Sequence, residues 1–430
     1  MQFVKKTFLL FLFYTLIFRP EFVFVPISIN TFFGLLGVVV YFADVNARKN
    51  ICHFTLLAPF SILKYVIPFV IVALISVIAN HSSDFFFLRY GISIVLGFFA
   101  AYFIAYVCYG IYGEMTVDIV IKYLMASQII FLGLGLVFFF NRDLLYIIYE
   151  ITRLDADNVT YMRVEGTRLI SLGENFFGAG VINGFILLVM AMWMSIRNMT
   201  PIKESLLIVY YFVVLAIGLM SARTTMTGAT IGIVILLLYK AKNSKTFLKN
   251  LLAIVLSIMI LIPVSNYFLQ NQSAEFGILR SFGFEMFDNY EETGEFSTSS
   301  SDKMLGFYDI VPDNLATWFL GDAKWTDGKG GYYKHTDAGY FRCIFYFGCI
   351  GLFCMLFYYF KYLDIIFNKK GVLKPIKKTA VWAIFVYALI LNIKGFADLY
   401  FLVIPFYFCR QNIENKTLTG LKNRLYSIKM

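Results

Sequence analysis

Stretches of about 20 apolar residues recur along this chain, and they constrain its fold more than any other feature. The first begins near residue 7 and the last ends near residue 409. Apolar residues make up 60% of the 430 residues, charged residues only 15%, and the mean hydropathy is +0.73. A soluble protein of this length needs a polar surface, which these runs leave no room for. The sequence therefore predicts an all-α, polytopic integral membrane protein.

Twelve segments are apolar and long enough to be predicted as transmembrane helices, with shorter ones accepted where Pro or Gly interrupts them. The first resembles a signal peptide, but Arg19-Pro20-Glu21 interrupts it and no cleavage site of small residues follows, so we interpret it as a retained span. The whole chain, 1–430, is predicted to be a single membrane domain. The predicted ranges are 5–20, 24–43, 62–80, 90–111, 119–140, 176–196, 205–221, 225–240, 250–269, 338–360, 379–394 and 398–410.

The positions of the 37 Lys and Arg residues favour one orientation of these spans. If the N-terminus is cytoplasmic, most of them fall on the inner face, including clusters in the short loops 240–249 and 361–378. Short cytoplasmic loops of membrane proteins are rich in basic residues, so we expect both termini in the cytoplasm. The net charge of +10 then reflects contact with inner-leaflet lipid, and no nucleic-acid partner is expected.

Two segments, 141–174 and 270–336, are too polar to cross a membrane, and the alternation of the spans places both on the outer face. The second is a large external loop between predicted spans nine and ten, and its mixed composition is typical of short helices that lie on a membrane. Neither segment contains any of the six Cys, so no disulfide-bonded or zinc-binding external domain is predicted. The chain lacks a P-loop and a dinucleotide-binding fingerprint, which argues against ATP hydrolysis and redox chemistry.

The predicted outer face carries arginine where the inner face carries mostly lysine. A guanidinium binds phosphate through two parallel hydrogen bonds, so an outward set of arginines suggests an anionic ligand. The alternative is that these are solvated loop charges, an interpretation that suits Arg142 and Arg153 best. The outward arginines are Arg142, Arg153, Arg163, Arg168, Arg223 and Arg280.

Arg223 lies in the stretch from Gly218 to Gly228, which joins two apolar spans with almost no loop. Its guanidinium is therefore expected at or just below the membrane surface. An Arg at mid-membrane costs about 2.5–3.5 kcal/mol on insertion scales and less near the edge, so such a residue usually has a partner. The alternative is that the side chain simply extends to the lipid headgroups.

Arg168 begins a run in which the first polar segment leads into an apolar span through Gly173, Glu174 and Asn175. Gly and Asn permit tight backbone turns, and the start of a helix at the membrane surface offers free N–H groups to an anion. The run therefore favours an anion-binding turn. The alternative is an ordinary helix start that Glu174 or Asn175 caps.

His335, Thr336 and Asp337 lie where the second polar segment meets the next span, and Tyr340 and Arg342 follow them. An imidazole titrates near neutral pH, so His335 could accept a proton from a hydroxyl group. The alternative is that these residues only cap the helix, with Asp favoured there by the helix dipole.

In their order and spacing these stretches resemble the O-antigen and capsule polymerases, which are relatives of the O-antigen ligases. As topology the resemblance spans the chain, and as motifs it covers residues 160–360. It rests on the run from Arg168 to Asn175, the bend Ser221-Ala222-Arg223, Asn314 and the stretch Trp318 to Asp322, and Thr336 to Arg342 followed by Tyr346 to Gly351.

The resemblance implies an all-helical bacterial glycosyltransferase of the inner membrane that needs no metal or other cofactor. Its donor and acceptor would both be oligosaccharide repeats linked to undecaprenyl pyrophosphate. The growing chain would be transferred on the periplasmic face onto a new lipid-linked repeat, with inversion at the anomeric carbon, to build O-antigen or capsular polysaccharide. A flippase and a chain-length regulator would be its protein partners.

Carried over onto this sequence, the family pattern assigns Arg168 and Arg223 to the donor pyrophosphate, with Arg280 as a third by charge and side of the membrane. His335 occupies the place of the presumed base of the ligases. The ligase pattern continues with Asn, whereas Thr336-Asp337 follows here, so Asp337 competes with His335 as the base. Supporting positions are expected for Arg163, Glu174, Asn175, Tyr340 and Arg342.

Two other functions remain open. A ligase would transfer the chain to the lipid A core, and the Thr336-Asp337 departure from the ligase pattern argues against it. A flippase for lipid-linked oligosaccharides would also have about twelve spans, but it would need charged groups along an inner cavity and no large outer loop. The predicted spans 90–111, 176–196 and 225–240 are almost free of charge, which argues against a flippase.

Overall fold

The computed structural model describes residues 2–52, 58–152, 168–240, 285, 288–295, 297–329, 331–370 and 372–410. Regular structure in these ranges is helical, and the only β-type pairing in them consists of two isolated bridges. The predicted all-α class is therefore confirmed.

Six helices in the described ranges are long and apolar enough to cross a membrane. α17 continues into a π-helical turn, Asp364–Lys369, and a 3₁₀ turn, Lys374–Ile376, precedes α18. The predicted class of membrane protein with several transmembrane helices is supported by these apolar helices. The six are α6 (Phe86–Tyr112), α7 (Val117–Phe140), α10 (Phe176–Ile196), α11 (Pro201–Ser221), α17 (Gly339–Leu363) and α18 (Lys377–Lys394).

The count of twelve spans is not confirmed. α2 (Ile29–Ala43) and α3 (Val45–Ile51) make a seventh span only if the pair, bent by 104°, crosses as one. The other apolar helices are shorter than the roughly 20 residues that a straight span needs. The predicted span 250–269 lies outside the described residues. The shorter helices are α1 (Gln2–Phe18), α5 (Ile67–Ala79) and α12 (Thr225–Lys240), while range 398–410 holds only α19 (Tyr400–Val403) and a 3₁₀ turn, Ile404–Phe408.

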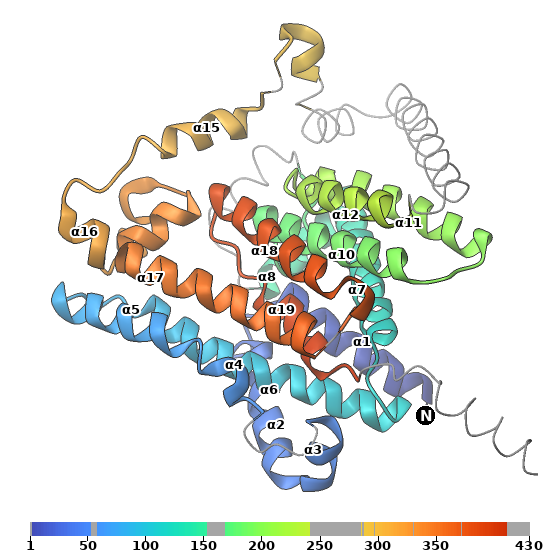
Figure 1. The fold of residues 1–430 in the computed structure, drawn as a ribbon. Coiled ribbons are helices and arrows are strands. Elements are labelled where there is room, and N and C mark those ends of the chain that lie inside the picture. Colours follow the sequence, from blue (N-terminus) through green and yellow to red (C-terminus); the bar gives the residue numbers. More distant parts are fainter. Residues whose placement is uncertain are drawn as a thin grey trace, which may run out of the picture.

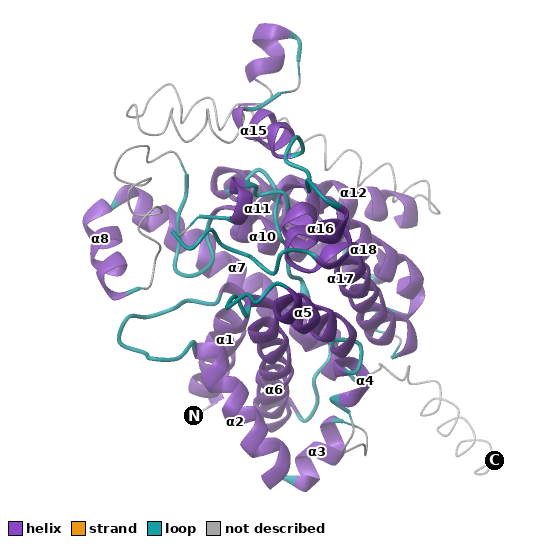
Figure 2. Cartoon of the chain, turned by 90° about the vertical axis from the view of Figure 1, so that its left-hand side faces the viewer, coloured by secondary structure: helices purple, strands orange, loops and turns teal. Residues whose placement is uncertain are grey.

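The two polar segments contain short helices, as the sequence predicts for the larger one. In Figures 1 and 2, which are related by a quarter turn about the vertical, α15 lies at the upper end of the molecule and α3 at the lower end. The assignment of these ends to the two faces of the membrane stays a prediction. The short helices of the two segments are α8 (Arg142–Ile151), α15 (Ser299–Phe307), α16 (Leu315–Leu320) and the 3₁₀ turn Tyr333–His335, and a further short helix, α4 (Phe60–Leu63), lies outside them.

α10 forms the centre of the bundle and packs against α7, α11, α12 and α18 (Figure 1). Every residue from Ala179 to Met192 is buried, which explains why this stretch is apolar on all sides rather than on one stripe. The one polar side chain between Ala179 and Met192, that of Asn183, accepts a hydrogen bond from Gln128 of α7 at 3.1 Å. The start of α10 is thereby fixed with respect to its neighbours.

α17 is interrupted at Phe347 and Gly348, where Gly348 adopts a left-handed conformation (φ 70°). An interruption frees backbone carbonyls, which need other donors inside a membrane. The segment after α16 supplies them, because the N–H groups of Asp322 and Ala323 donate to the carbonyls of Phe345 and Tyr346 at 2.6 and 3.0 Å. This pairing anchors the described part of the second polar segment against α17.

Candidate functional site

Arg223 lies on a tight bend between two apolar helices. α11 ends at Ser221, and α12 begins at Thr225. Within the bend the N–H of Ala222 donates to the carbonyl of Gly218 at 2.8 Å, and the N–H of Thr225 donates to the carbonyl of Ala222 at 3.0 Å. These bonds satisfy backbone groups that lipid could not, so the bend can persist at a membrane edge.

Arg223 has a partner, as the cost of placing an Arg in this position predicts. Its guanidinium forms an ion pair with Glu285, and both side chains are mostly buried. Glu285 also accepts a hydrogen bond from the backbone N–H of Ser299, the first residue of α15, at 2.7 Å. Burial opposes ionisation of Glu285, but the bonds from Ser299 and Arg223 outweigh it and lower the pKa of its carboxyl. The interaction ties the second polar segment to the bend.

The bend fits closely against the start of α10 at a glycine. A Cβ atom on Gly180 would lie 2.8 Å from the Cβ of Thr224 and 2.9 Å from that of Ala222. Only a residue without a side chain permits this approach. Gly180 therefore brings the bend that carries Arg223 beside the stretch that precedes α10.

Arg168 begins that stretch, and the described backbone next to it is bonded to α11. The N–H of Leu169 donates to the carbonyl of Met220 at 3.1 Å. Phe176, the first residue of α10, adopts φ 51°, a left-handed conformation that is rare for a bulky residue. The guanidinium carbon of Arg168 lies 5.4 Å from the centroid of the Phe176 ring, within range of a cation–π interaction.

Arg168 and Arg223 line the same cavity, which has a volume of about 300 Å³ and which we call the basic cavity. Among the described residues four basic side chains and one carboxylate line it, so even with Arg223 paired to Glu285 the cations are in excess and the cavity attracts anions. Phe176, Phe177, Met304 and Phe307 supply its apolar wall. The charged residues are Arg168, Arg223, Lys303, Lys394 and Asp337.

Lys394 and Asp337 meet in the basic cavity because their chain segments come into backbone contact next to them. A Cβ atom on Gly339 would lie 2.6 Å from the carbonyl carbon of Gly395. Sequence reasoning missed both Lys394 and Lys303. Lys394 at the end of an apolar span was a usable signal, since a charge there needs a reason. Lys303, in a polar segment, gave none.

Arg342 holds Asp337 from outside the basic cavity. Its Nη1 lies 3.7 Å from Oδ1 of Asp337. The Arg342 guanidinium carbon lies 3.8 Å from the centroid of the Trp325 ring and 3.6 Å from that of Tyr332, so both rings restrict its movement. Burial raises the pKa of the Asp337 carboxyl above its ordinary value, although the positive charges of Arg342 and Lys394 oppose the rise.

His335 lies apart from this group. It is exposed, has a left-handed backbone (φ 55°), and is absent from the lining of the basic cavity. Thr336 stabilises the local turn, because its hydroxyl accepts the N–H of Ala338 at 3.3 Å. Ala338 is the N-cap of α17, and no side-chain hydrogen bond caps the helix, so His335, Thr336 and Asp337 do not cap it. His335 and Asp337, which are separated by one residue, therefore have different surroundings.

The other residues expected in supporting positions have structural contacts. The amide of Asn175 accepts from the N–H of Ser171 at 3.0 Å and donates to the carbonyl of Gly173 at 2.8 Å, so it shapes the turn before α10. The hydroxyl of Tyr340 donates to the carbonyl of Leu389 at 2.7 Å. Glu174 pairs with Arg19 at 3.0 Å beside a different cavity. Arg163 and Arg280 lie outside the described residues.

No group of three or more His, Cys, Asp or Glu side chains in the described part of the chain could hold a metal ion. Neither a scan of the sequence against protein-family models nor a search of curated proteins found a match.

Proposed function

We propose that this chain is a bacterial membrane glycosyltransferase that joins oligosaccharide repeats linked to undecaprenyl pyrophosphate, as an O-antigen or capsule polymerase of the inner membrane. The observation that carries the proposal is the basic cavity, which Arg168, Arg223, Lys303 and Lys394 line together with Asp337. Several cations in a partly enclosed site suit a pyrophosphate diester, whose phosphates are both ionised. A guanidinium can bind a phosphate through two hydrogen bonds, which Arg223 would donate from the N–H groups that Glu285 does not occupy.

The size and wall of the basic cavity fit the reacting part of such a donor. About 300 Å³ is at the lower end of the range for small-molecule sites, so it suits the pyrophosphate and its flanking groups rather than a whole oligosaccharide. Phe176, Phe177, Met304 and Phe307 offer apolar contacts to the first units of the lipid chain. The position beside helices able to cross a membrane would let the rest of the lipid stay in the bilayer.

In the proposed reaction the acceptor hydroxyl oxygen attacks the anomeric carbon of the donor sugar, and the bond from that carbon to the pyrophosphate oxygen breaks. The leaving oxygen keeps the electron pair, and the bound guanidinium and ammonium groups stabilise the charge that develops there. The hydroxyl proton passes to a base. The products are a lengthened lipid-linked chain and free undecaprenyl pyrophosphate.

Of the two candidate bases, Asp337 is the one that we assign. It lines the basic cavity beside the cations, whereas His335 does not. A carboxylate with a raised pKa is a better proton acceptor than an ordinary one, and Arg342 keeps it oriented. The phosphate-binding residues would then stabilise the departing pyrophosphate oxygen, while the base removes the proton from the attacking hydroxyl.

The surface polysaccharide of a strain that lacks this chain tests the proposal. Loss of a polymerase should leave single repeats attached to their normal surface anchor, because flipping and ligation of one unit still occur. Loss of a ligase or a flippase should leave no repeats attached at all. Long attached chains in the deletion strain would rule out all three functions.

A further inference from the structure

A second and larger cavity lies on the other side of Phe176 and Phe177, which line both cavities. Its volume is about 600 Å³. Residues from the end of α1, from α6, α8 and the turn before α10, and from the segment after α18 line it, so it is built from distant parts of the chain. We call it the mixed cavity. Its charged and tyrosine residues are Arg19, Glu21, Glu174, Asp398, Tyr90, Tyr149 and Tyr332.

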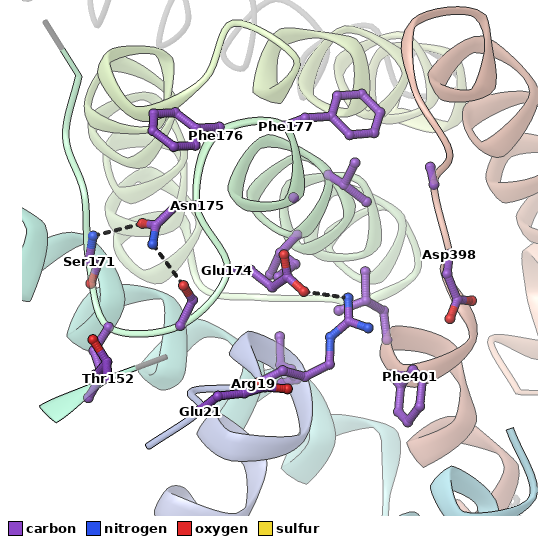
Figure 3. A pocket seen from close by; sticks show the side chains of 18 of the residues that line it. Arg19, Glu21, Thr152, Ser171, Glu174, Asn175, Phe176, Phe177, Asp398 and Phe401 are labelled. Atoms are coloured by element: carbon purple, nitrogen blue, oxygen red, sulfur yellow. Dashed lines mark hydrogen bonds and ion pairs between the residues drawn. The ribbon is translucent and has the colours of Figure 1, made fainter. Parts of the chain in front are cut away.

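The charge of the mixed cavity is opposite in kind to that of the basic cavity. In the part of the lining that the structure describes there are three carboxylates, and Arg19 is the one basic residue. Figure 3 shows the Arg19 guanidinium between Glu174, which it contacts at 3.0 Å, and Asp398. The carboxylates would repel a pyrophosphate. A cationic ligand would be repelled by Arg19, which already occupies the place between the carboxylates. An uncharged ligand fits this balance best.

The backbone around Arg19 is fixed before any ligand binds. Arg19 adopts φ 48°, a left-handed conformation that non-glycine residues rarely hold without support. The N–H of Glu174 donates to the carbonyl of Phe18 at 2.6 Å, which joins the end of α1 to the turn before α10. Preorganisation of this kind lowers the entropy cost of binding.

The lining also offers hydrogen-bonding groups of both kinds. Carboxylates accept hydrogen bonds from hydroxyl groups, and these charge-assisted bonds are the stronger ones. The hydroxyl of Tyr149 and Nε of Arg19 are buried and have no hydrogen-bond partner in the described part of the chain. A buried polar group without a partner costs about 1–3 kcal/mol, so a ligand or water that supplies one is favoured. Tyr90 and Phe401 add aromatic rings.

We infer that the mixed cavity binds the sugar rings of a neutral oligosaccharide. Sugar hydroxyls both donate and accept, which matches the carboxylates together with Tyr149 and Arg19, and the C–H faces of sugar rings pack on aromatic rings. Phe176 and Phe177 line both this site and the basic cavity, so the two sites are adjacent and one extended substrate molecule would occupy both. The identity of the oligosaccharide as the polymerised repeat rests on the proposed function.

Binding of the free repeat oligosaccharide to the purified full chain in lipid nanodiscs tests this inference. The probe is the repeat released by mild acid from the lipid-linked intermediates of the same strain, and saturation-transfer NMR reports its Kd. Tyr149→Phe removes one hydroxyl and should weaken binding about fivefold, and Asp398→Asn should weaken it about tenfold. The matched control is Tyr146→Phe, an equivalent change on α8 outside the lining, which should keep the wild-type Kd.

Arg223→Lys separates the two cavities, because it should lower polymerisation about 10²-fold or more and leave the Kd of the free repeat unchanged. If wild-type protein polymerises lipid-linked repeats but binds no free repeat, or if Tyr149→Phe and Asp398→Asn both keep the wild-type Kd, the inference is wrong and the proposed function stands. If the two substitutions weaken binding but the wild-type protein shows no polymerase activity, the inference stands and the proposed function is wrong.

The free repeat also distinguishes the two sources of the sugar in the mixed cavity. If the cavity binds the acceptor, a labelled lipid-linked donor should lengthen the free repeat. If it binds the sugars of the donor, the free repeat should compete with the lipid-linked substrate without being lengthened.

Discussion

Asp337 and His335 are separated by one residue, yet only Asp337 lines the basic cavity. Removal of a general base lowers a rate by about 10²–10⁴-fold. We therefore expect Asp337→Asn to lose turnover by at least about 10²-fold and His335→Asn to keep most of it. Turnover of purified lipid-linked repeat by the two variants decides the assignment. A loss confined to His335→Asn would show that the exposed imidazole is the base.

The pH dependence of the rate gives a second test of Asp337, through Arg342. Burial raises the pKa of the Asp337 carboxyl, and the charge of Arg342 opposes this rise. A base acts in its deprotonated form, so the rate is full above this pKa and is lost as the pH falls through it. Arg342→Gln removes an opposing charge and should therefore move the acid limb of the profile to higher pH.

Arg197→Gln is the matched control for Arg342→Gln, since Arg197 is bonded to Asp118 at 2.6 Å and lines neither cavity. Its acid limb should coincide with that of the wild type. If Arg342→Gln also leaves the acid limb in place, Asp337 is not the group that titrates.

At the scale of elements, the contact between the start of α17 and the end of α18 keeps Asp337 and Lys394 together. Gly339→Ala would place a Cβ atom 2.6 Å from the backbone of Gly395. Overpacking of this kind costs about 1–3 kcal/mol, and the backbone must move apart to relieve it. We expect Gly339→Ala to unfold at a lower temperature than the wild type. We also expect its turnover to fall by more than the decrease in the amount of folded protein.

Gly110→Ala is the control for this change, because no atom of a neighbouring described segment lies within 4 Å of a Cβ atom at Gly110 in α6. Alanine is a better helix former than glycine, so this variant should be at least as stable as the wild type. Equal midpoints and turnover for Gly339→Ala and Gly110→Ala would mean that the close contact does not hold the site together.

Helices were predictable from the sequence where they are long and apolar on every side. The predicted range 176–196 coincides with α10, and 90–111 lies within α6. The range 24–43 ends with α2 at Ala43, but α2 begins only at Ile29, after Ser28 caps it by accepting the N–H of Thr31 at 3.2 Å. An apolar run does not reveal a helix start that depends on one capping residue.

The site was predictable only in part, for a related reason. Arg168 and Arg223 stand out because an arginine beside an apolar span needs a partner. Glu285, Lys303 and Lys394 reach them through tertiary contacts between distant segments, such as the Gly339–Gly395 contact, and no local pattern encodes these. Expectations for Arg163 and Arg280 remain predictions, because both lie outside the described residues.

At the scale of the whole molecule, α15 and α3 lie at opposite ends (Figures 1 and 2). We predict that the end with α15 faces the periplasm. Asp302→Cys on α15 should react with a membrane-impermeant maleimide in intact spheroplasts, and Lys49→Cys on α3 should react only after permeabilisation. Both positions are exposed, and the parent chain corrects for Cys349, the exposed native cysteine. Reaction of Lys49→Cys alone in intact spheroplasts would invert the topology.

We propose that the basic cavity holds the pyrophosphate of a lipid-linked donor during sugar transfer. The most direct measurement is the turnover of purified lipid-linked repeat by Arg223→Lys protein, which keeps the charge but loses the two-point hydrogen bonding of the guanidinium. We predict a loss of about 10²-fold or more at a normal protein level, while Arg142→Lys, an arginine that does not line the basic cavity, polymerises normally. Wild-type chain lengths from Arg223→Lys would contradict the claim.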